Sequence, residues 1–349
     1  MLIIILVIIG LSLLILGHEA GHFFAAKAFG LQVDEFGFGF PPRLTSWKKG
    51  ETEYSLNWLP FGGFVKIAGE RGEFEMLEPS GAYEDAPDAS RFLYAQPMWK
   101  KSIIVLAGVF VNFLLGWLFL SLTLMIGAPQ ALVVGGVQPD SPAAQAGIMA
   151  GDVVKNFTSA QSFIDFVNMH RGETTTIAVL RGNKEIDFSV VPRVQTAPGQ
   201  GAVGVALAEA GTPREGFFSA FKDGLVDAGI IAWLTLQAFY QLFVQLLFHA
   251  SLLPGVVGPV GIFGLAEETG KIGLVYLLQL FGVISLNLTV VNLIPFPALD
   301  GGRFLMAILE KIKGSAISYR TEAWVNSLGF ALLIVLMILL TIRDVGGLI

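Results

Sequence analysis

The sequence predicts a polytopic α-helical membrane protein with four transmembrane helices, a re-entrant β-hairpin and an inserted α+β domain. Only 14% of the 349 residues are charged and 54% are hydrophobic, whereas a typical soluble domain has roughly 25% charged residues. Apolar runs long enough to cross a bilayer alternate with more polar stretches, and one of these stretches has the alternating pattern of β-strands. The chain is long enough for two or three domains.

The composition excludes several classes of function. The formal net charge of −6 offers no basic surface for nucleic acid, so we expect no nucleic-acid partner. The chain has no cysteine, which excludes disulfides, thiolate catalysis and cysteine-ligated zinc. The N-terminus lacks the basic region and cleavage site of a signal peptide, so we expect the first apolar segment to stay in the mature protein.

Residues 1–30 are predicted to form the first transmembrane helix, and they contain the pattern H-E-x-x-H. His18 and His22 are four residues apart, so they share one face of a helix and can together bind one Zn²⁺. Glu19 can take a proton from a metal-bound water, which makes it the candidate catalytic base. In a soluble helix this pattern is often coincidence, but such residues inside a membrane span are costly unless they are used.

Residues 31–101 are predicted to be cytoplasmic. No basic residue precedes the first helix and several follow it, so the positive-inside rule puts the N-terminus outside. Residues 36–66 read as two strands too apolar for water, with Gly37, Phe38 and Gly39 in an alternating F-G-F-G-F stretch. We expect a re-entrant β-hairpin beside the metal, because strand edges are tolerated at membrane depth only next to protein or a cavity. An ordinary cytoplasmic hairpin is the alternative.

Residues 102–127 are predicted to form the second transmembrane helix, in which Gly108 and Asn112 are interpreted as helix-contact positions. Residues 128–197 then change to the strand, turn and short-helix patterns of a small α+β domain outside the cytoplasm. The stretch S-P-A-A-Q-A-G, followed by G-D-V, resembles the PDZ domains of bacterial membrane proteases. Such domains bind peptide tails by strand addition, and a steric or structural module is the alternative.

Residues 273–302 are predicted to form the third transmembrane helix and the turn that ends it. Asp300 follows an apolar run and two prolines that must break the helix. A carboxylate there needs a partner, and a metal held together with the two histidines is the best one available; an interfacial aspartate that caps the next helix is the alternative. Residues 303–322 are then a cytoplasmic loop, and residues 323–343 are the fourth transmembrane helix, which returns the C-terminus to the outside.

Residues 198–272 are interpreted as a linker and an interfacial amphipathic helix at 217–253. This segment is apolar enough to be taken for a further span, but topology argues against one. His18 and Asp300 both lie late in their helices, so the two helices must run in the same direction if they share a metal. That requires an odd number of crossings between them, and the second helix already supplies one.

Four motifs carry a resemblance that covers essentially the whole chain. They are H-E-A-G-H in the first helix, F-G-G-F-V-K in the hairpin, G-P-V-G-I at 258–262, and N-L-I-P-F-P-A-L-D-G-G at the end of the third helix. In this order they resemble the site-2 protease family of intramembrane zinc metalloproteases, in its bacterial regulator-of-sigma-E type with a single PDZ domain. The resemblance implies a set of zinc ligands, namely His18, His22 and Asp300. It further implies that Glu19 is the catalytic base and that Asn287 and Asn292 lie near the bound substrate.

The expected function is therefore that of an intramembrane zinc endopeptidase, which cleaves transmembrane segments of single-pass membrane proteins in regulated intramembrane proteolysis. Its substrates would be of the anti-sigma factor or signal-peptide-remnant type. It would lie in the bacterial cell (inner) membrane, with both termini and the PDZ-like domain outside the cytoplasm. The alternative is a membrane-anchored scaffold whose PDZ-like domain binds peptide tails and whose zinc site is structural or vestigial. A zinc transporter is disfavoured because no internal repeat is visible.

Overall fold

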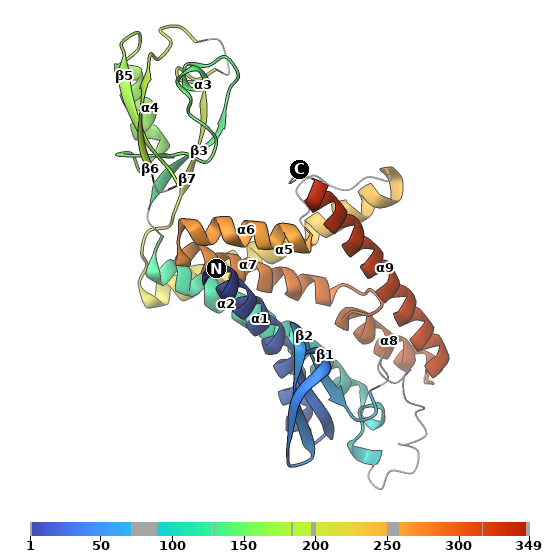
Figure 1. Cartoon of the computed structure of the whole chain (residues 1–349). Helices are drawn as coiled ribbons and strands as arrows, with labels where there is room; N and C mark the ends of the chain where they lie inside the picture. Colours follow the sequence, from blue (N-terminus) through green and yellow to red (C-terminus); the bar gives the residue numbers. More distant parts are fainter. Residues whose placement is uncertain are drawn as a thin grey trace. The chain divides into compact units, whose positions relative to one another are not determined.

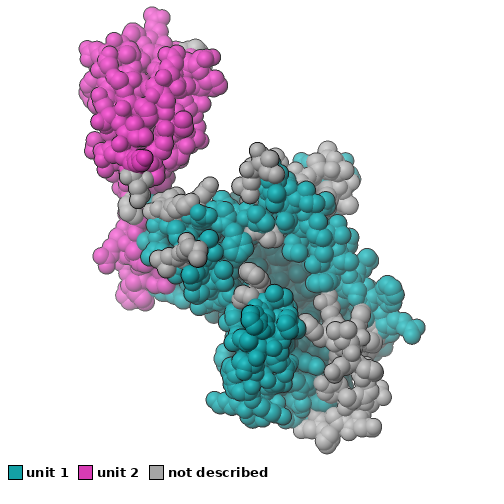
Figure 2. Space-filling model, in the orientation of Figure 1, with its two compact units in different colours: residues 1–121, 221–349 teal, residues 122–220 magenta. Residues whose placement is uncertain are grey.

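The computed structural model describes residues 2–70, 89–128, 130–182, 184–196, 200–249, 258–315 and 317–346. The chain divides into two compact units, one of residues 1–121 and 221–349 and the other of residues 122–220 (Figure 2). The first unit is mainly helical and the second is built on a β-sheet. The coarse prediction, a membrane protein of apolar helices with a small β-containing part, is confirmed.

Five helices in the described ranges are long and apolar enough to cross a membrane. Four of them match the predicted spans: α1 (Leu2–Ala28), α2 (Met98–Ile126), α7 (Leu274–Leu293) and α9 (Tyr319–Gly346). The fifth is α5 (Phe217–His249), which includes most of the segment predicted to be interfacial. The last residues of that segment, 250–253, lie outside the described residues. Shorter helices are η3 (Ala89–Arg91), η4 (Leu93–Ala95), α6 (Pro259–Ile272) and α8 (Asp300–Lys313).

Close glycine contacts show that α1 and α2 are antiparallel. A Cβ atom added at Gly17 would lie 2.5 Å from a methyl carbon of Leu115, and one added at Gly21 would lie 2.5 Å from the carbonyl oxygen of Ala107. Later positions of α1 thus face earlier positions of α2. Small residues at these positions let the two backbones approach closely, as is common between membrane helices.

Helices α2 and α7 are also antiparallel. A Cβ atom at Gly116 would meet Leu286 at 2.6 Å, and one at Gly282 would meet Leu120 at 3.2 Å. Helix α7 therefore runs in the same direction as α1, as a metal site shared by the ends of these two helices requires. Between them α6 has only 14 residues, about 21 Å of helix, which is short for a span. The prediction of four spans, with α5 at the interface, fits this parity.

Helix α5 makes few contacts for its length, since only 6% of its most apolar 18-residue stretch is buried. The indole nitrogen of Trp117 on α2 donates to the Phe221 carbonyl at 2.8 Å, and the Thr235 hydroxyl donates to Asn287 of α7 at 2.7 Å. Large apolar side chains such as Trp233 and Phe243 are more than half exposed. A helix with this much apolar surface is suited to lipid contact.

The G-P-V-G-I motif begins α6, and its backbone amides hydrogen-bond to a side chain of α9. The Asp344 carboxylate, near the end of α9, accepts hydrogen bonds from the amides of Gly258 at 3.2 Å and Gly261 at 2.8 Å. A carboxylate at a helix N-terminus satisfies free N–H groups and faces the positive end of the helix dipole. The motif thus ties α6 to α9, while α6 also packs on α1 and α7 (Figure 1).

The predicted hairpin is formed by β1 (Val33–Lys49) and β2 (Thr52–Ile67), which pair antiparallel and lie beside α1 (Figure 1). Register shifts interrupt both strands, so their halves lie side by side in one sheet. The first half of β1 lies between the two halves of β2, and the second half of β1 pairs with the first half of β2. Gly37, for example, is opposite Ser55 on one side and Phe64 on the other. Residues 63–67 pair with the first half of β1, which makes them the outer strand of this sheet among the described residues, and β2 also packs against α1.

The second unit contains a five-stranded antiparallel sheet in the order β6-β5-β4-β3-β7. Its strands are β3 (Ala131–Val137), β4 (Val153–Val154), β5 (Thr175–Arg181), β6 (Lys184–Val190) and β7 (Val205–Ala210). Helices α3 (Pro142–Ala146) and α4 (Ala160–Met169) complete it. Strand β7 lies beyond the predicted domain end at residue 197. Residues 200–211 can be interpreted from the sequence as a remnant strand, and the pairing of β7 with β3 makes it part of this sheet.

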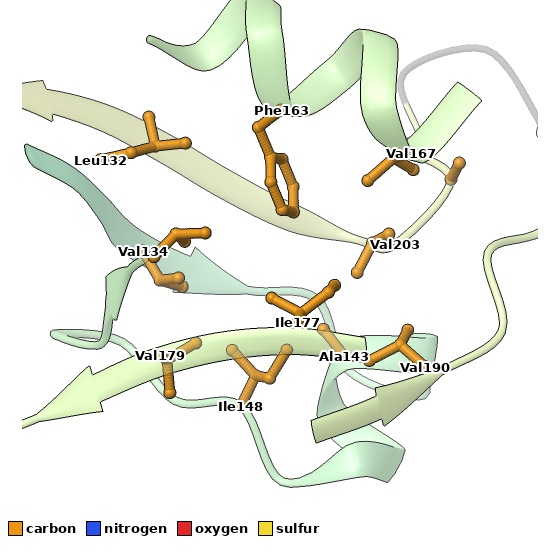
Figure 3. Close-up of a cluster of buried hydrophobic side chains, with 12 residues drawn as sticks. Leu132, Val134, Ala143, Ile148, Phe163, Val167, Ile177, Val179, Val190 and Val203 are labelled. Carbon is orange, nitrogen blue, oxygen red and sulfur yellow. The ribbon is translucent and has the colours of Figure 1, made fainter. Parts of the chain in front are cut away.

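The core of this unit is a single cluster of aliphatic side chains and Phe163 (Figure 3). Phe163 and Val167 of α4 point toward Ile177 and Val203 from the strands and loops below (Figure 3). The S-P-A-A-Q-A-G motif forms helix α3 together with the residues that cap its two ends. The Ser141 side chain accepts from the Ala144 amide, and Gly147 ends the helix at a positive φ of 91°, a conformation that suits glycine.

The aspartate of the G-D-V motif holds the turn that follows α3. The Asp152 carboxylate accepts hydrogen bonds from Arg181 at 2.7 and 2.8 Å and from the Met149 amide at 2.9 Å. Asp152 is 1% exposed. The guanidinium of Arg181 lowers the pKa of Asp152 below its usual value, against the opposing effect of burial. This ion pair, in which the carboxylate is buried and the guanidinium is partly exposed, links the α3 turn to the end of β5.

Candidate metal centre and active site

The three predicted zinc ligands converge in the first unit, although 282 positions separate His18 from Asp300 in the sequence. His18 and His22 lie one turn apart on α1, and their Nε2 atoms are 3.2 Å apart. The Oδ2 atom of Asp300 lies 3.0 Å from Nε2 of His18 and 3.4 Å from Nε2 of His22. All three side chains are largely buried, with 11–12% of their surface exposed. The structure thus brings the predicted histidines and carboxylate together.

The spacing of these atoms fits a zinc ion. Tetrahedral coordination with bonds of roughly 2.0–2.1 Å holds ligand atoms about 3.3 Å apart, and the observed separations are 3.0, 3.2 and 3.4 Å. No described N–H or O–H group donates to the buried Oδ2 of Asp300 with hydrogen-bond geometry. A buried carboxylate oxygen without a donor needs a cation. Two imidazoles and one carboxylate are also the ligand type of catalytic zinc sites that keep a position for water.

Two glycines explain how Asp300 reaches the histidines. Helix α7 ends at Leu293 and α8 begins at Asp300 itself. A Cβ atom at Gly301 would lie 2.2 Å from the carbonyl oxygen of Ile294, and one at Gly302 would lie 2.1 Å from that of Phe296. Only glycine lets α8 start this close to the preceding turn. The capping alternative is not what the geometry gives, because the N-cap of α8 is Leu299 and no side chain caps it.

Helix α2 supplies the groups that hold the imidazoles. The Nδ1 atom of His22 lies 2.8 Å from the carbonyl oxygen of Ile104, and Nδ1 of His18 lies 3.2 Å from the amide nitrogen of Asn112. A Cβ atom at Gly108 would lie 2.4 Å from Nε2 of His22, so the absence of a side chain there makes room for the rings.

The sequence predicts Gly108 and Asn112 as helix contacts, whereas the structure places them against the histidines. A signal was present, since the two residues are four apart and therefore share a face of the second helix. A buried amide on such a face of an apolar helix needs a polar partner. The sequence did not show that the partner was the metal site, because that depends on how α2 packs against α1.

Glu19 lines the same cavity as the ligands, which has a volume of about 580 Å³. A Cβ atom added at Gly63, on the outer hairpin strand, would lie 3.3 Å from Cγ of Glu19. Ion pairs line this cavity too, and one of them joins Glu70, after the hairpin, to Arg303 of α8. Charged and apolar side chains thus both line the cavity, and the candidate base, the ligands and the hairpin edge all border it.

The predicted substrate-binding residues lie in different places. Asn292 lines the cavity, whereas Asn287 accepts a hydrogen bond from Thr235 of α5. Gly37 and Phe38 each have strand neighbours on both sides within the hairpin sheet. Gly39 has a positive φ of 79°, and a Cβ there would lie 2.5 Å from the Leu59 carbonyl. The hairpin residues that border the cavity include Phe64 and Val65 of the outer strand.

Comparison with known proteins agrees with this centre. Residues 6–336 match the model of a family described as "Peptidase family M50". The chain belongs to this family. It is 35% identical, over 98% of both chains, to a Clostridium perfringens protein named "Putative zinc metalloprotease CPE1693". It is 30% identical to the zinc metalloprotease RasP of Geobacillus kaustophilus and 29% identical to the regulator of sigma-W protease RasP of Bacillus subtilis, over 95% of each chain.

The family match and the relatives test several predictions made from the sequence. The M50 chain is a zinc-dependent protease, and its apolar helices make it a multi-pass membrane protein. The resemblance to site-2 proteases is confirmed, and the enzyme is favoured over the scaffold alternative. The PDZ-like assignment, the number of spans, the domain limits and the individual site residues stay predictions.

Proposed function

We propose that this M50 protease cleaves transmembrane segments of single-pass membrane proteins within the bilayer. The observation that carries the proposal is the convergence of His18, His22 and Asp300 beside Glu19, in a cavity that the hairpin and helices of membrane-spanning length line together. A hydrolytic centre at this position can reach peptide bonds that soluble proteases cannot. A zinc ion held by His18, His22 and Asp300 would polarise the scissile carbonyl and make a bound water more acidic.

Glu19 is the general acid–base in this proposal. It follows His18 directly on α1, and its carboxylate side chain borders the cavity that the ligands line. It takes the proton from the attacking water and delivers it to the leaving amine nitrogen as the peptide bond breaks. His18, His22 and Asp300 have no proton to move in this scheme, and their function is to hold the metal.

A transmembrane helix must unwind before it can be cleaved, because its peptide groups are hydrogen-bonded to one another. We assign the docking of the unwound segment to the outer hairpin strand, residues 63–67, which pairs with β1 on one side and passes next to Glu19. An extended substrate added to this strand would have its backbone beside the metal ligands. Gly37 and Phe38 would act one strand further away, by pairing with Phe64 and Gly63.

Asn292 and Asn287 have different expected parts in substrate binding. Asn292 borders the cavity, so its amide can hydrogen-bond a substrate backbone directly. Asn287 accepts from Thr235 at 2.7 Å, and an amide that accepts one hydrogen bond still carries two N–H donors. Asn287 can therefore donate to a substrate backbone while it keeps its hydrogen bond to α5.

The cellular setting follows from the charge distribution. Lys27 and Arg91 lie near the inner end of α1 and bond to Glu51 of the hairpin, which supports a cytoplasmic position for this end. The protein then lies in the bacterial cell (inner) membrane, with both termini and the PDZ-like domain outside the cytoplasm.

Strand β7 is at the edge of its sheet, where a peptide tail could add as a further strand. The name of the Bacillus subtilis relative, a regulator of sigma-W protease, supports membrane-bound anti-sigma factors as substrates, with signal-peptide remnants as a second type.

The test uses purified full-length protein and a model single-pass substrate. Glu19→Gln should keep zinc at the wild-type level and lower the cleavage rate by about 10²–10⁴-fold, the usual contribution of a general acid–base. Glu185→Gln, on the surface of the other unit with 59% side-chain exposure, is the matched control and should cleave normally. Wild-type cleavage by Glu19→Gln would remove Glu19 from the mechanism. Cleavage of soluble loops but not of transmembrane segments would overturn the intramembrane assignment.

A further inference from the structure

The two zinc-binding imidazoles are each supported at their second nitrogen by α2. For His22, the supporting atom is the carbonyl oxygen of Ile104, 2.8 Å from Nδ1. A carbonyl oxygen can only accept, so Nδ1 of His22 carries the proton and its Nε2 is free to bind metal. The chain therefore selects the metal-binding tautomer of His22 with its backbone.

His18 needs the same support but faces a side chain. Its Nε2 points to Asp300, and its Nδ1 lies 3.2 Å from the amide group of Asn112. A neutral imidazole that binds metal through Nε2 has its proton on Nδ1 and must donate it. The acceptor that Asn112 can offer is Oδ1, and this atom is buried without a hydrogen-bond partner among the described residues. A half-turn of the amide exchanges its two ends and pairs Oδ1 with Nδ1–H.

We propose that Asn112 is a positioning residue, whose Oδ1 accepts the Nδ1–H of zinc-bound His18 and thereby fixes the tautomer and the ring orientation. This inference rests on the zinc dependence of the M50 family and does not depend on the identity of the substrate. It assigns to the Asn112 side chain the task that the Ile104 carbonyl performs for His22.

The surroundings of Asn112 suit a fixed support. Asn112 is 1% exposed, and its backbone carbonyl accepts a 2.7 Å hydrogen bond from the Ser285 hydroxyl of α7, which is fully buried. The residue is thus held between α1, which carries the two histidines, and α7, which precedes the turn to Asp300. Groups that hold the second nitrogen of a zinc-bound histidine typically contribute 10–100-fold to metal affinity.

The test compares two substitutions by zinc affinity, measured on full-length protein by competition with a chelator. Asn112→Leu keeps the approximate volume but removes the acceptor, and it should weaken zinc binding about 10–100-fold. Asn112→Asp keeps an acceptor oxygen, and it should bind zinc at least as tightly as the wild type. The visible spectrum of the Co²⁺-loaded protein should be changed by Asn112→Leu and preserved by Asn112→Asp.

The aspartate variant separates positioning from packing. If Asn112 only fills space, a buried carboxylate would destabilise this region and Asn112→Asp would bind zinc more weakly than Asn112→Leu. That order of affinities would overturn the proposal, and so would wild-type affinity in Asn112→Leu. If the leucine variant does not fold, the comparison of Asn112→Asp with the wild type still decides. Asn168→Leu, the same change at an exposed position on α4 of the other unit, is the control and should leave zinc affinity unchanged.

Discussion

Gly108 offers the sharpest test of the metal centre, because an added methyl group at this position would occupy the same space as the ligands. In Gly108→Ala the new Cβ would lie 2.4 Å from Nε2 of His22 and 2.8 Å from Cε1 of His18. Ordinary carbon contacts are roughly 3.5–4.0 Å. The imidazoles or α2 must therefore move by about 1 Å.

A displacement of this size exceeds what a zinc site tolerates. Metal–ligand distances must stay within about 0.2 Å of their usual values, so a shift of the ring by several times this amount separates His22 from the other ligands. Loss of the support groups alone lowers metal affinity 10–100-fold, and displacement of a ligand should cost more. We expect zinc affinity to fall by at least about 100-fold, with cleavage falling in parallel.

The assay is zinc content per protein after dialysis against a weak chelator, together with the chelator-competition affinity. Gly229→Ala is the matched control, because a Cβ added at Gly229 on α5 has no atom within 4 Å. In that helix the change should be neutral or stabilising by up to about 1 kcal/mol. Size-exclusion behaviour and resistance to proteolysis would show that both variants fold. Full zinc affinity in a folded Gly108→Ala protein would refute the geometry described for α1 and α2.

Two further predictions follow from the ion pairs. Asp300→Asn should lower zinc occupancy while leaving the fold intact, since an amide is a poor zinc ligand; metal analysis showing full occupancy would exclude Asp300 from the ligand set. In the other unit, the pKa of Asp152 is lowered by Arg181, so its stabilising effect is present above the unfolded pKa of about 3.9 and is lost as pH falls through the lower folded value. Asp152→Asn should destabilise this unit by about 2 kcal/mol and remove that acid dependence. Hydrogen exchange of β5 amides between pH 5 and 3 measures both, and identical profiles for wild type and variant would contradict the prediction.

Much of the centre could be predicted from local sequence. The four-residue spacing of His18 and His22 places two imidazoles on one helix face whatever the rest of the chain does. Asp300 is predicted as a ligand because a carboxylate after an apolar run needs a partner. Candidate membrane-spanning segments can be predicted because length and apolarity are properties of contiguous residues. The family motifs were readable for the same reason.

Tertiary structure decided which surfaces meet. Gly108 and Asn112 lie against the histidines because α2 packs antiparallel to α1 at that depth, and this register depends on contacts between residues far apart in sequence. The strand beside Glu19 was likewise decided by the double pairing of β1, which leaves residues 63–67 outermost. Strand β7 joins its sheet only through β3, more than sixty residues earlier. Periodicity in a sequence determines the face that a helix or strand presents, whereas the partner of that face is selected by long-range packing.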